Sequence, residues 1–371
     1  MKDKLLGWFI RNLLNRLRII NIPGFLLFKI QGTNSYGRQV LLPEDLVAEL
    51  EERMRSNSTE LYSLGKKFGY NYVAIQNIPT ISKCSRKKFL FYTYFLVRSV
   101  ECVYADRLKH KIDYDRRIFR LKMKNYIICR KNGLGYIFSM GGIAGVWAYI
   151  VENNSVEAVK PECEGRGARE CLVIAAPYKE LLEMGYEPIT CKELESLEIT
   201  RQYIEINRVR TRKYARYSLE SLINSNFISY KHGQMVYRNE RFFLVEASFL
   251  YTLEKELAKI ENGLETLWQC SFNFGRILEK VSNRPEPCKF IMDFIPALGF
   301  GDILALKREN KYEIIVYCFP WTKWYKDIDF TLFRALLSGI ISEYEKKEVR
   351  LENIEKEITE ENGLSLYISE S

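Results

Sequence analysis

The chain has 371 residues, of which 47% are apolar and 28% are charged. These values are typical of a globular protein with room for two or three domains, and they exclude a disordered or fibrous chain. The formal charge of +9 is a mild basic excess. It falls well short of a dedicated nucleic-acid-binding protein, so nucleic acid is not an expected partner.

The first predicted element is a basic amphipathic helix. One face carries Leu5, Leu6, Phe9, Ile10, Leu13, Leu14 and Leu17, and the other carries Lys4, Arg11, Asn15 and Arg18. Pro23-Gly24 ends it. Such a helix covers a core or a dimer interface, or it lies on an anionic membrane surface through residues 1–20. We assign residues 1–30 to this helix and its lead-in.

An internal repeat follows along the chain. The stretch LYSLGKKFG (61–69) matches LWQCSFNFG (267–275), and each is preceded by a helical stretch rich in Leu and Glu, 46–54 and 253–261. Two further apolar helix faces match each other, at 143–150 and 337–344. Gly145 aligns with Gly339 inside these helices, where glycine costs about 1 kcal/mol relative to alanine. We therefore expect the backbone of each helix to pack closely against another element.

Short strand-like runs come after each of these helices. In the first unit they are 155–159 and 171–175, and in the second they are 348–353 and 364–369. A further hairpin is predicted at 302–319, with its turn near Asn310. The pattern predicts an α+β fold: two tandem copies of a domain in which helices gather on one face of an antiparallel sheet.

The predicted boundaries put the two copies at 31–178 and 236–371. A helical basic linker, 179–235, joins them. It contains RVRTRKYARYS (208–218), which either faces water or forms a phosphate-binding patch.

Nine cysteines, an odd number at irregular spacing, argue against a disulfide framework and indicate a reducing, cytoplasmic compartment. No apolar run approaches the roughly 18 residues that a membrane span needs. Cys163 and Cys171 are eight residues apart and bracket a glycine-rich, charged loop. The residues leave three interpretations open: a metal site, a redox pair, or structural thiols. The repeat alignment places Cys171 on the inward face of its strand and Cys163 at the far end of the hairpin loop.

The helix GGIAGVWAYI (141–150), the following strand and Cys163-x3-Gly167-x3-Cys171 resemble the 4-vinyl reductase-type domain. LYSLGKKFGY (61–70) and LGFGDILAL (298–306) agree with this resemblance. It implies a small-molecule-binding domain, related in fold to TRAPP-type transport subunits and haem–nitric-oxide sensor domains. It also implies that the second copy is degenerate and that the protein forms a homodimer, or a pseudo-dimer of its two copies.

The resemblance further implies a zinc site made by Glu-x-x-Cys-x7-Cys and an earlier cysteine. In this chain the two later cysteines are Cys163 and Cys171, but Lys160 stands at the glutamate position. The earlier cysteine falls near Phe138, where there is none. Since zinc sites are almost always four-coordinate, two ligands are missing. Glu162, Cys129 or Cys191 can replace them only if the fold brings them close.

No catalytic motif is present. His110 and His232, the only histidines, lie in polar surroundings that indicate surface positions. Nothing resembles a flavin or nicotinamide site, so the family's name does not imply a reductase activity.

The aromatic residues suggest a pocket. Tyr62, Phe68, Phe138 and Trp147 can line a cavity between helices and sheet, or they form solid core. The predicted function is non-catalytic binding or sensing of a small hydrophobic or planar molecule. The alternative is a scaffold protein that uses the fold for dimerisation.

Overall fold

The structure is a computed structural model that describes residues 19–30, 32–33, 35–127, 129, 137–191, 194, 213–231, 234–282, 286–320, 326–359 and 363–370. Residues 1–18 of the predicted amphipathic helix and residues 208–212 of the basic stretch lie outside these ranges. Residues 19–22, which the helix was expected to include up to Pro23, form a strand. Within the described ranges, no helix has both the length and the apolar character to cross a bilayer.

Twelve named elements make up the described part of the first half. They are β1 (Ile19–Ile22), β2 (Phe25–Lys29), β3 (Tyr36–Pro43), α2 (Glu44–Arg53), α3 (Ser58–Ile75), α4 (Arg86–Tyr104), β4 (Arg107–Asp113), β5 (Ile118–Lys124), α6 (Ile137–Ile150), β6 (Val156–Glu162), β7 (Cys171–Pro177) and α7 (Tyr178–Glu183).

The second half follows a similar order. Its described elements are α8 (Leu219–Asn224), β8 (Ser229–Lys231), β9 (Gln234–Tyr237), β10 (Glu240–Glu246), α9 (Ser248–Leu257), α10 (Gly263–Ser282), α11 (Pro287–Phe294), β11 (Asp302–Arg308), β12 (Lys311–Phe319), α12 (Thr331–Glu345), β13 (Asn353–Thr359) and β14 (Gly363–Ser369).

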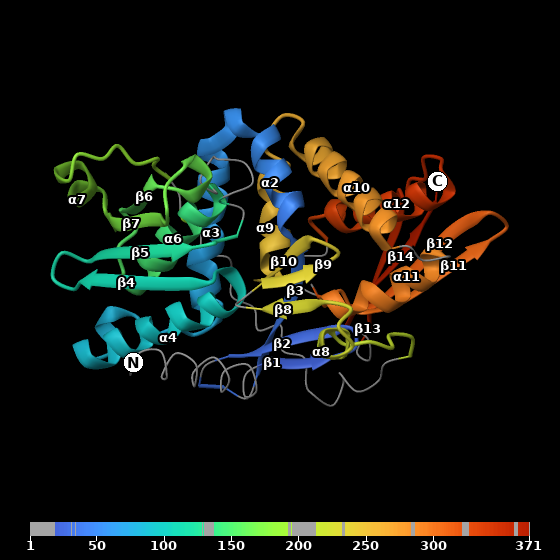
Figure 1. Cartoon of the computed structure of the whole chain (residues 1–371), viewed down its shortest axis with the longest axis horizontal. Helices are drawn as coiled ribbons and strands as arrows, with labels where there is room; N and C mark the ends of the chain where they lie inside the picture. Colours follow the sequence, from blue (N-terminus) through green and yellow to red (C-terminus); the bar gives the residue numbers. More distant parts are fainter. Residues whose placement is uncertain are drawn as a thin grey trace.

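The strands form three antiparallel sheets. The two four-stranded sheets have the orders β4-β5-β7-β6 and β11-β12-β14-β13, which is the same topology twice. Figure 1 shows them on opposite sides of a central six-stranded sheet of order β1-β2-β3-β10-β9-β8. Helices pack against these antiparallel sheets, so the predicted α+β class is confirmed. That the halves are copies of one domain stays a prediction, which the shared order supports.

The central sheet joins the two halves. Strand β3 pairs antiparallel with β10, with Val40 opposite Val245. The buried guanidinium of Arg38 reaches from β3 into the second half, donating to the carbonyls of Cys318 (2.9 Å) and Gly299 (3.1 Å). Burial lowers the pKa of Arg38 to about 10. Strands β1 and β8, at the edges, lie in the segments predicted as lead-in and linker; at four and three residues they are too short to show alternation.

The predicted hairpin at 302–319 is confirmed as β11–β12. Arg308 pairs with Lys311, which leaves Glu309 and Asn310 as a two-residue turn. Their φ angles of 47° and 67° are those of a type I′ turn, whose twist matches the flanking strands.

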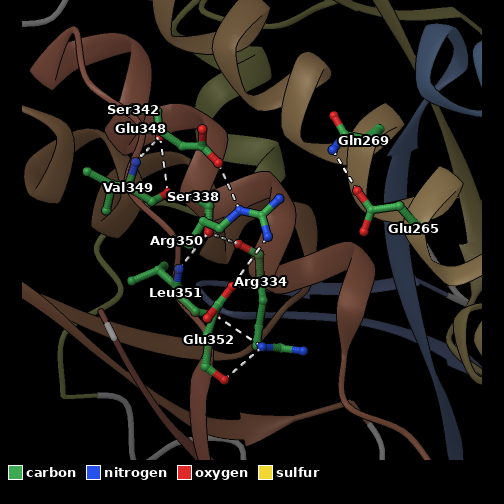
Figure 2. A network of polar contacts seen from close by, with 10 residues as sticks. All are labelled: Glu265, Gln269, Arg334, Ser338, Ser342, Glu348, Val349, Arg350, Leu351 and Glu352. Atoms are coloured by element: carbon green, nitrogen blue, oxygen red, sulfur yellow. Dashed lines mark hydrogen bonds and ion pairs between the residues drawn. The ribbon is translucent and has the colours of Figure 1, made fainter.

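The predicted strand at 348–353 is wrong, because β13 begins only at Asn353. Val349 and Leu351 are buried as alternation indicates, but serines of α12 meet their backbone, as Figure 2 shows. The hydroxyl of Ser342 accepts from the Val349 amide (2.8 Å), and that of Ser338 accepts from the Leu351 amide (3.0 Å). A helix face thus supplies here the hydrogen bonds that a neighbouring strand supplies elsewhere.

Glycines bring two helix pairs into backbone contact, as the sequence predicted. A Cβ built on Gly145 of α6 would lie 2.7 Å from the Tyr70 amide nitrogen of α3, and closer still to the Lys66 carbonyl. In the second half, a Cβ on Gly339 of α12 would lie 2.9 Å from the Phe272 carbonyl carbon of α10. Real Cβ atoms do not approach other atoms so closely, so only glycine permits these crossings.

Gly145→Ala is therefore expected to lower the free energy of unfolding by about 1–3 kcal/mol, because the helices must separate. The control is Gly142→Ala in the same helix, where the nearest atom to a new Cβ is the Gly65 carbonyl oxygen at 3.7 Å. That variant should be neutral or more stable by up to about 1 kcal/mol, through helix propensity. Urea denaturation of both variants measures the difference; equal costs would contradict the close-contact argument.

Candidate metal centre

Three cysteines from separate parts of the first half come together where β6 ends and β7 begins. Cys129 lies between β5 and α6, Cys163 follows β6, and Cys171 begins β7. Their Sγ atoms all lie within 4.8 Å of one another, and the side chains are buried. Among the residues that the structure describes, this is the one group of three or more His, Cys, Asp or Glu side chains arranged to hold a metal ion.

The loop between β6 and β7 sets the two later thiols in place. The Cys163 carbonyl accepts hydrogen bonds from the amides of Arg166 and Ala168, which closes a tight turn after the cysteine. Gly167 completes the turn at φ +90°, a left-handed conformation that favours glycine. At the other side of the loop, Cys171 pairs with Met123 near the end of β5. The chain that leaves β5 then leads to Cys129.

Polar groups surround the thiols. The Nζ atom of Lys160 lies 2.6 Å from the Cys129 Sγ. The Glu164 amide donates to the Cys171 Sγ (3.3 Å), and the Glu164 carboxylate lies 4.0 Å from that sulfur while accepting from the Asn125 amide (2.8 Å). The sulfurs are therefore in an environment that can stabilise a thiolate.

The three thiols also shift one another's pKa values. Hydrogen bonds from Cys129 and Cys171 lower the pKa of Cys163, and the Lys160 charge acts in the same direction. Donation to Cys163 is the largest cause of the raised pKa of Cys129. The Lys160 charge favours the thiolate form of all three cysteines, which is the form that binds metal and reacts.

This arrangement corrects the sequence prediction at several positions. The repeat alignment puts Cys163 at the far end of the hairpin loop, but its side chain is buried, with 1% exposed. Cys129, weighed only as a substitute, is the third thiol, whereas Glu162 is exposed and Cys191 lies outside the cluster. Lys160 does point to the site, as its alignment with a ligand position suggested, but it brings an ammonium group. Cys129 lies 34 residues before Cys163, and nothing in that spacing signals proximity.

A second buried charged group was not predicted at all. Lys66 of α3 and Glu157 of β6 form an ion pair at 2.7 Å, with side chains 0% and 4% exposed. The hydroxyl of Tyr62 donates to the same carboxylate (2.7 Å) and accepts from the Ala158 amide (2.8 Å). Cys191 adds its backbone amide to Glu157 (3.1 Å). The carboxylate is well satisfied, so the group ties α3 to the sheet.

The four aromatic residues proposed to bind a ligand pack against other side chains. Trp147 stacks on Phe119 at 5.0 Å and donates its indole N–H to the Arg117 carbonyl (2.6 Å). Phe68 and Phe138 both contact Phe249 of α9, at 5.0 and 6.2 Å between ring centroids. Tyr62 belongs to the ion-pair group.

The structure thus brings Phe68 and Phe138 to one aromatic cluster, while Tyr62 and Trp147 have other partners. A hollow lined by residues of β2, α3 and α4 has a volume of about 20 Å³, enough for one water. An open hollow of about 280 Å³ lies beside Trp268, Arg334 and Arg350 in the second half. His110 is half-buried between Tyr94 and Phe119, and burial lowers its pKa to about 4. His232 lies outside the described residues.

Neither the family models nor the curated proteins that were compared match this chain.

Removing the Tyr62 hydroxyl tests the buried group. Tyr62→Phe leaves the Ala158 amide and the Glu157 carboxylate each short of one hydrogen bond, so we expect a loss of about 1–3 kcal/mol in unfolding free energy. Tyr149→Phe is the control, since that hydroxyl has no hydrogen bond within the described residues and its ring contact with Tyr70 is kept. Its expected change is within about 0.5 kcal/mol. A cost for Tyr149→Phe as large as that for Tyr62→Phe would contradict this role.

Proposed function

We propose that the chain is a non-catalytic binding protein whose first half holds a zinc ion through Cys129, Cys163 and Cys171. The single observation that carries this proposal is the convergence of three buried thiols within 4.8 Å. Thiolate sulfur is a preferred ligand of Zn²⁺, and with three protein ligands the fourth position of the tetrahedral site is left for water or a bound molecule. The thiols come from distant segments, so coordination would link the loop after β5 to the β6–β7 hairpin.

The redox state of the cysteines is consistent with this role. All nine are free thiols in the structure. Metal binding requires the three ligands to be reduced and deprotonated. A reducing, cytoplasmic compartment is accordingly part of the proposal.

The zinc content of the purified protein tests the proposal. We expect about one zinc per chain by mass spectrometry of elements, and loss of most of it in Cys129→Ser, Cys163→Ser and Cys171→Ser, since each removes one of three ligands. Cys270→Ser is the matched control, because Cys270 is equally buried but lies in α10 outside the cluster. Unchanged zinc in all three ligand variants would contradict the site.

Chelation gives an independent readout. Because binding energy is coupled to folding of the ligand segments, removing zinc should speed hydrogen exchange in residues 155–176. Exchange in the β11–β12 hairpin of the second half should stay the same. The protein is kept reduced throughout. If hydrogen exchange in residues 155–176 is the same before and after chelation, the thiols are structural.

The binding of a small hydrophobic or planar molecule remains a further proposal. It is supported by the resemblance to the 4-vinyl reductase-type domain, membership of which is itself a proposal. The hollow of about 20 Å³ is far below the roughly 300 Å³ of a small-molecule pocket, so a ligand there would require α3 and α4 to move apart. Native mass spectrometry would report such a ligand by its mass.

One observation favours the alternative of an assembly role. Strand β3 of the first half pairs with β10 of the second half, so the two halves associate through a shared sheet. A homodimer and membrane contact through residues 1–20 belong to the same proposal. Native mass spectrometry and flotation with anionic liposomes test these two points separately.

A further inference from the structure

The hairpin of β4 and β5 carries a double row of cations on the outward face of its sheet. The six residues, which we call the basic ladder, are Arg107, Lys109 and Lys111 of β4 and Arg120, Lys122 and Lys124 of β5. Arg120 is half-buried and the other five are exposed. The alternate residues Leu108, Leu121 and Met123 are buried, as the two-residue period of a strand requires.

The register of the hairpin places these cations directly opposite one another. Arg107 pairs with Lys124, Lys109 with Lys122, and Lys111 with Arg120. Like charges at directly opposite positions destabilise an antiparallel pair of strands. The hairpin therefore contains three repulsive pairs in succession, along a length of about 14 Å.

No acidic side chain among the described residues forms an ion pair with the ladder. The side-chain hydrogen bond of Arg120 goes to the Met184 sulfur (3.6 Å). Residues 107–124 contain eight Lys and Arg but two Asp, a formal charge of +6 against +9 for the whole chain. Averaging over 371 residues hides this concentration, which is why the total charge predicts no nucleic-acid partner.

The acidic groups around the ladder lie at its ends or beyond the neighbouring strand. Asp113 and Asp115 belong to the turn, and Glu180 and Glu183 of α7 pair there with Arg116. The residues at the other end are Asp106, which accepts from the Asn125 and Gln234 side chains, Glu164, which accepts from the Asn125 amide, and Glu170, which follows Arg169. Glu162 of β6 is separated from β5 by β7, a distance of about 10 Å.

Protection of a sheet edge explains only half of the ladder. Strand β4 forms the edge of its sheet, and β5 lies beside it (Figure 1). Lysine on an edge strand discourages pairing with another chain. Strand β5, however, pairs with β4 on one side and with β7 on the other, so it has no free edge to protect. Its three cations require another explanation.

The ladder is a narrow stripe. The neighbouring positions of β7 are Leu172, opposite Lys122, and Ile174, opposite Arg120; Ile174 is covered by Leu181 of α7. None of the exposed large apolar side chains in the described ranges lies on β4 or β5. A row of phosphates fits such a stripe. A bilayer extends beyond it on both sides, and stable anchoring there takes an apolar group as well as cations.

We propose that the basic ladder binds the phosphate backbone of a nucleic acid without reading its sequence. Lys and Arg side chains that contact phosphates release counterions, and this release supplies the affinity of sequence-independent binding. The ladder contains no aromatic side chain on which a base could stack. The inference does not depend on the metal centre, because Cys171 lies opposite Met123 on the buried face of the same sheet.

The test measures binding of the full chain to two fluorescent probes by anisotropy. The probes are an oligothymidylate strand and a mixed-sequence DNA duplex, each about 20 nucleotides long, which covers the ladder. For about five phosphate contacts, the logarithm of the affinity falls with the logarithm of the salt concentration with a slope of about −3.5 for the strand and −4.5 for the duplex. Raising the salt from about 50 to about 200 mM then weakens binding by roughly 100–500-fold.

The double variant Lys109→Gln, Lys122→Gln removes the central pair. We expect its salt slope to be shallower by about 1.4 on the strand or about 1.8 on the duplex, because two phosphate contacts are lost. The matched control is Lys289→Gln, Lys347→Gln, which removes two exposed lysines of the second half and should keep the wild-type slope. Without nucleic acid, the ladder variant should be at least as stable to heat as the wild type, since a like-charge pair is gone.

Three outcomes would overturn the inference. The first is no binding of the wild type to either probe at about 50 mM salt. The second is an equal change of slope in both double variants, which would show that total charge matters and the ladder does not. The third comes from cosedimentation with phosphatidylserine-containing vesicles: if the ladder variant loses vesicle binding but keeps nucleic-acid binding, the ladder is a membrane contact. Zinc content reports separately on the proposed metal function.

Discussion

The close approach of paired helices is the constraint on which the rest of the structure depends. At Gly65, Gly69, Gly141 and Gly145, the backbones of α3 and α6 meet with no room for a side chain. α6 consequently lies against both α3 and the sheet strands β6 and β7. The crossing of α10 with α12 at Gly275 and Gly339 repeats the arrangement in the second half. Since close-packed interiors do not absorb even one methyl group without strain, this distance also fixes how far α3 lies from the sheet.

Two lysines of the first half, Lys66 and Lys160, are buried, and their ammonium groups contact different side chains. Lys66 is neutralised by Glu157, so its pair joins α3 to β6 and leaves no charge to act on a ligand. The Nζ atom of Lys160, three residues beyond Glu157 on the same strand, lies 2.6 Å from the Cys129 sulfur. The second half has no equivalent thiols: Leu364 stands at the aligned position of Cys171, paired with Phe319, and Lys356 reaches the Ile328 carbonyl. The two halves share a topology, and among the described residues the three-thiol cluster lies in the first half.

Periodicity and glycine placement predicted the helices α6 and α12, their close backbone contacts and the β11–β12 hairpin, because both are local signals. The 302–319 hairpin, α12 and the alignment of Gly145 with Gly339 all follow from patterns within a few residues. The segment 348–353 shows where such signals fail. Alternation indicates which side chains are buried, but it does not indicate what the backbone hydrogen-bonds to. Here the backbone amides of Val349 and Leu351 donate to serine hydroxyls of α12. Strands as short as β1 and β8 give no period at all.

The sequence by itself determined the α+β class and the close helix contacts, because these depend on residues near one another in the chain. It named Cys163 and Cys171 as candidates and left metal, redox and structural roles open. Only the tertiary structure decided that Cys129 joins the two later thiols and that Lys160 provides a cation at 2.6 Å. It also decided that Tyr62 and Trp147 have separate partners. The reason is physical: metal binding and buried charge depend on distances of a few ångströms between segments, and those distances are set by the packing of helices against the sheet.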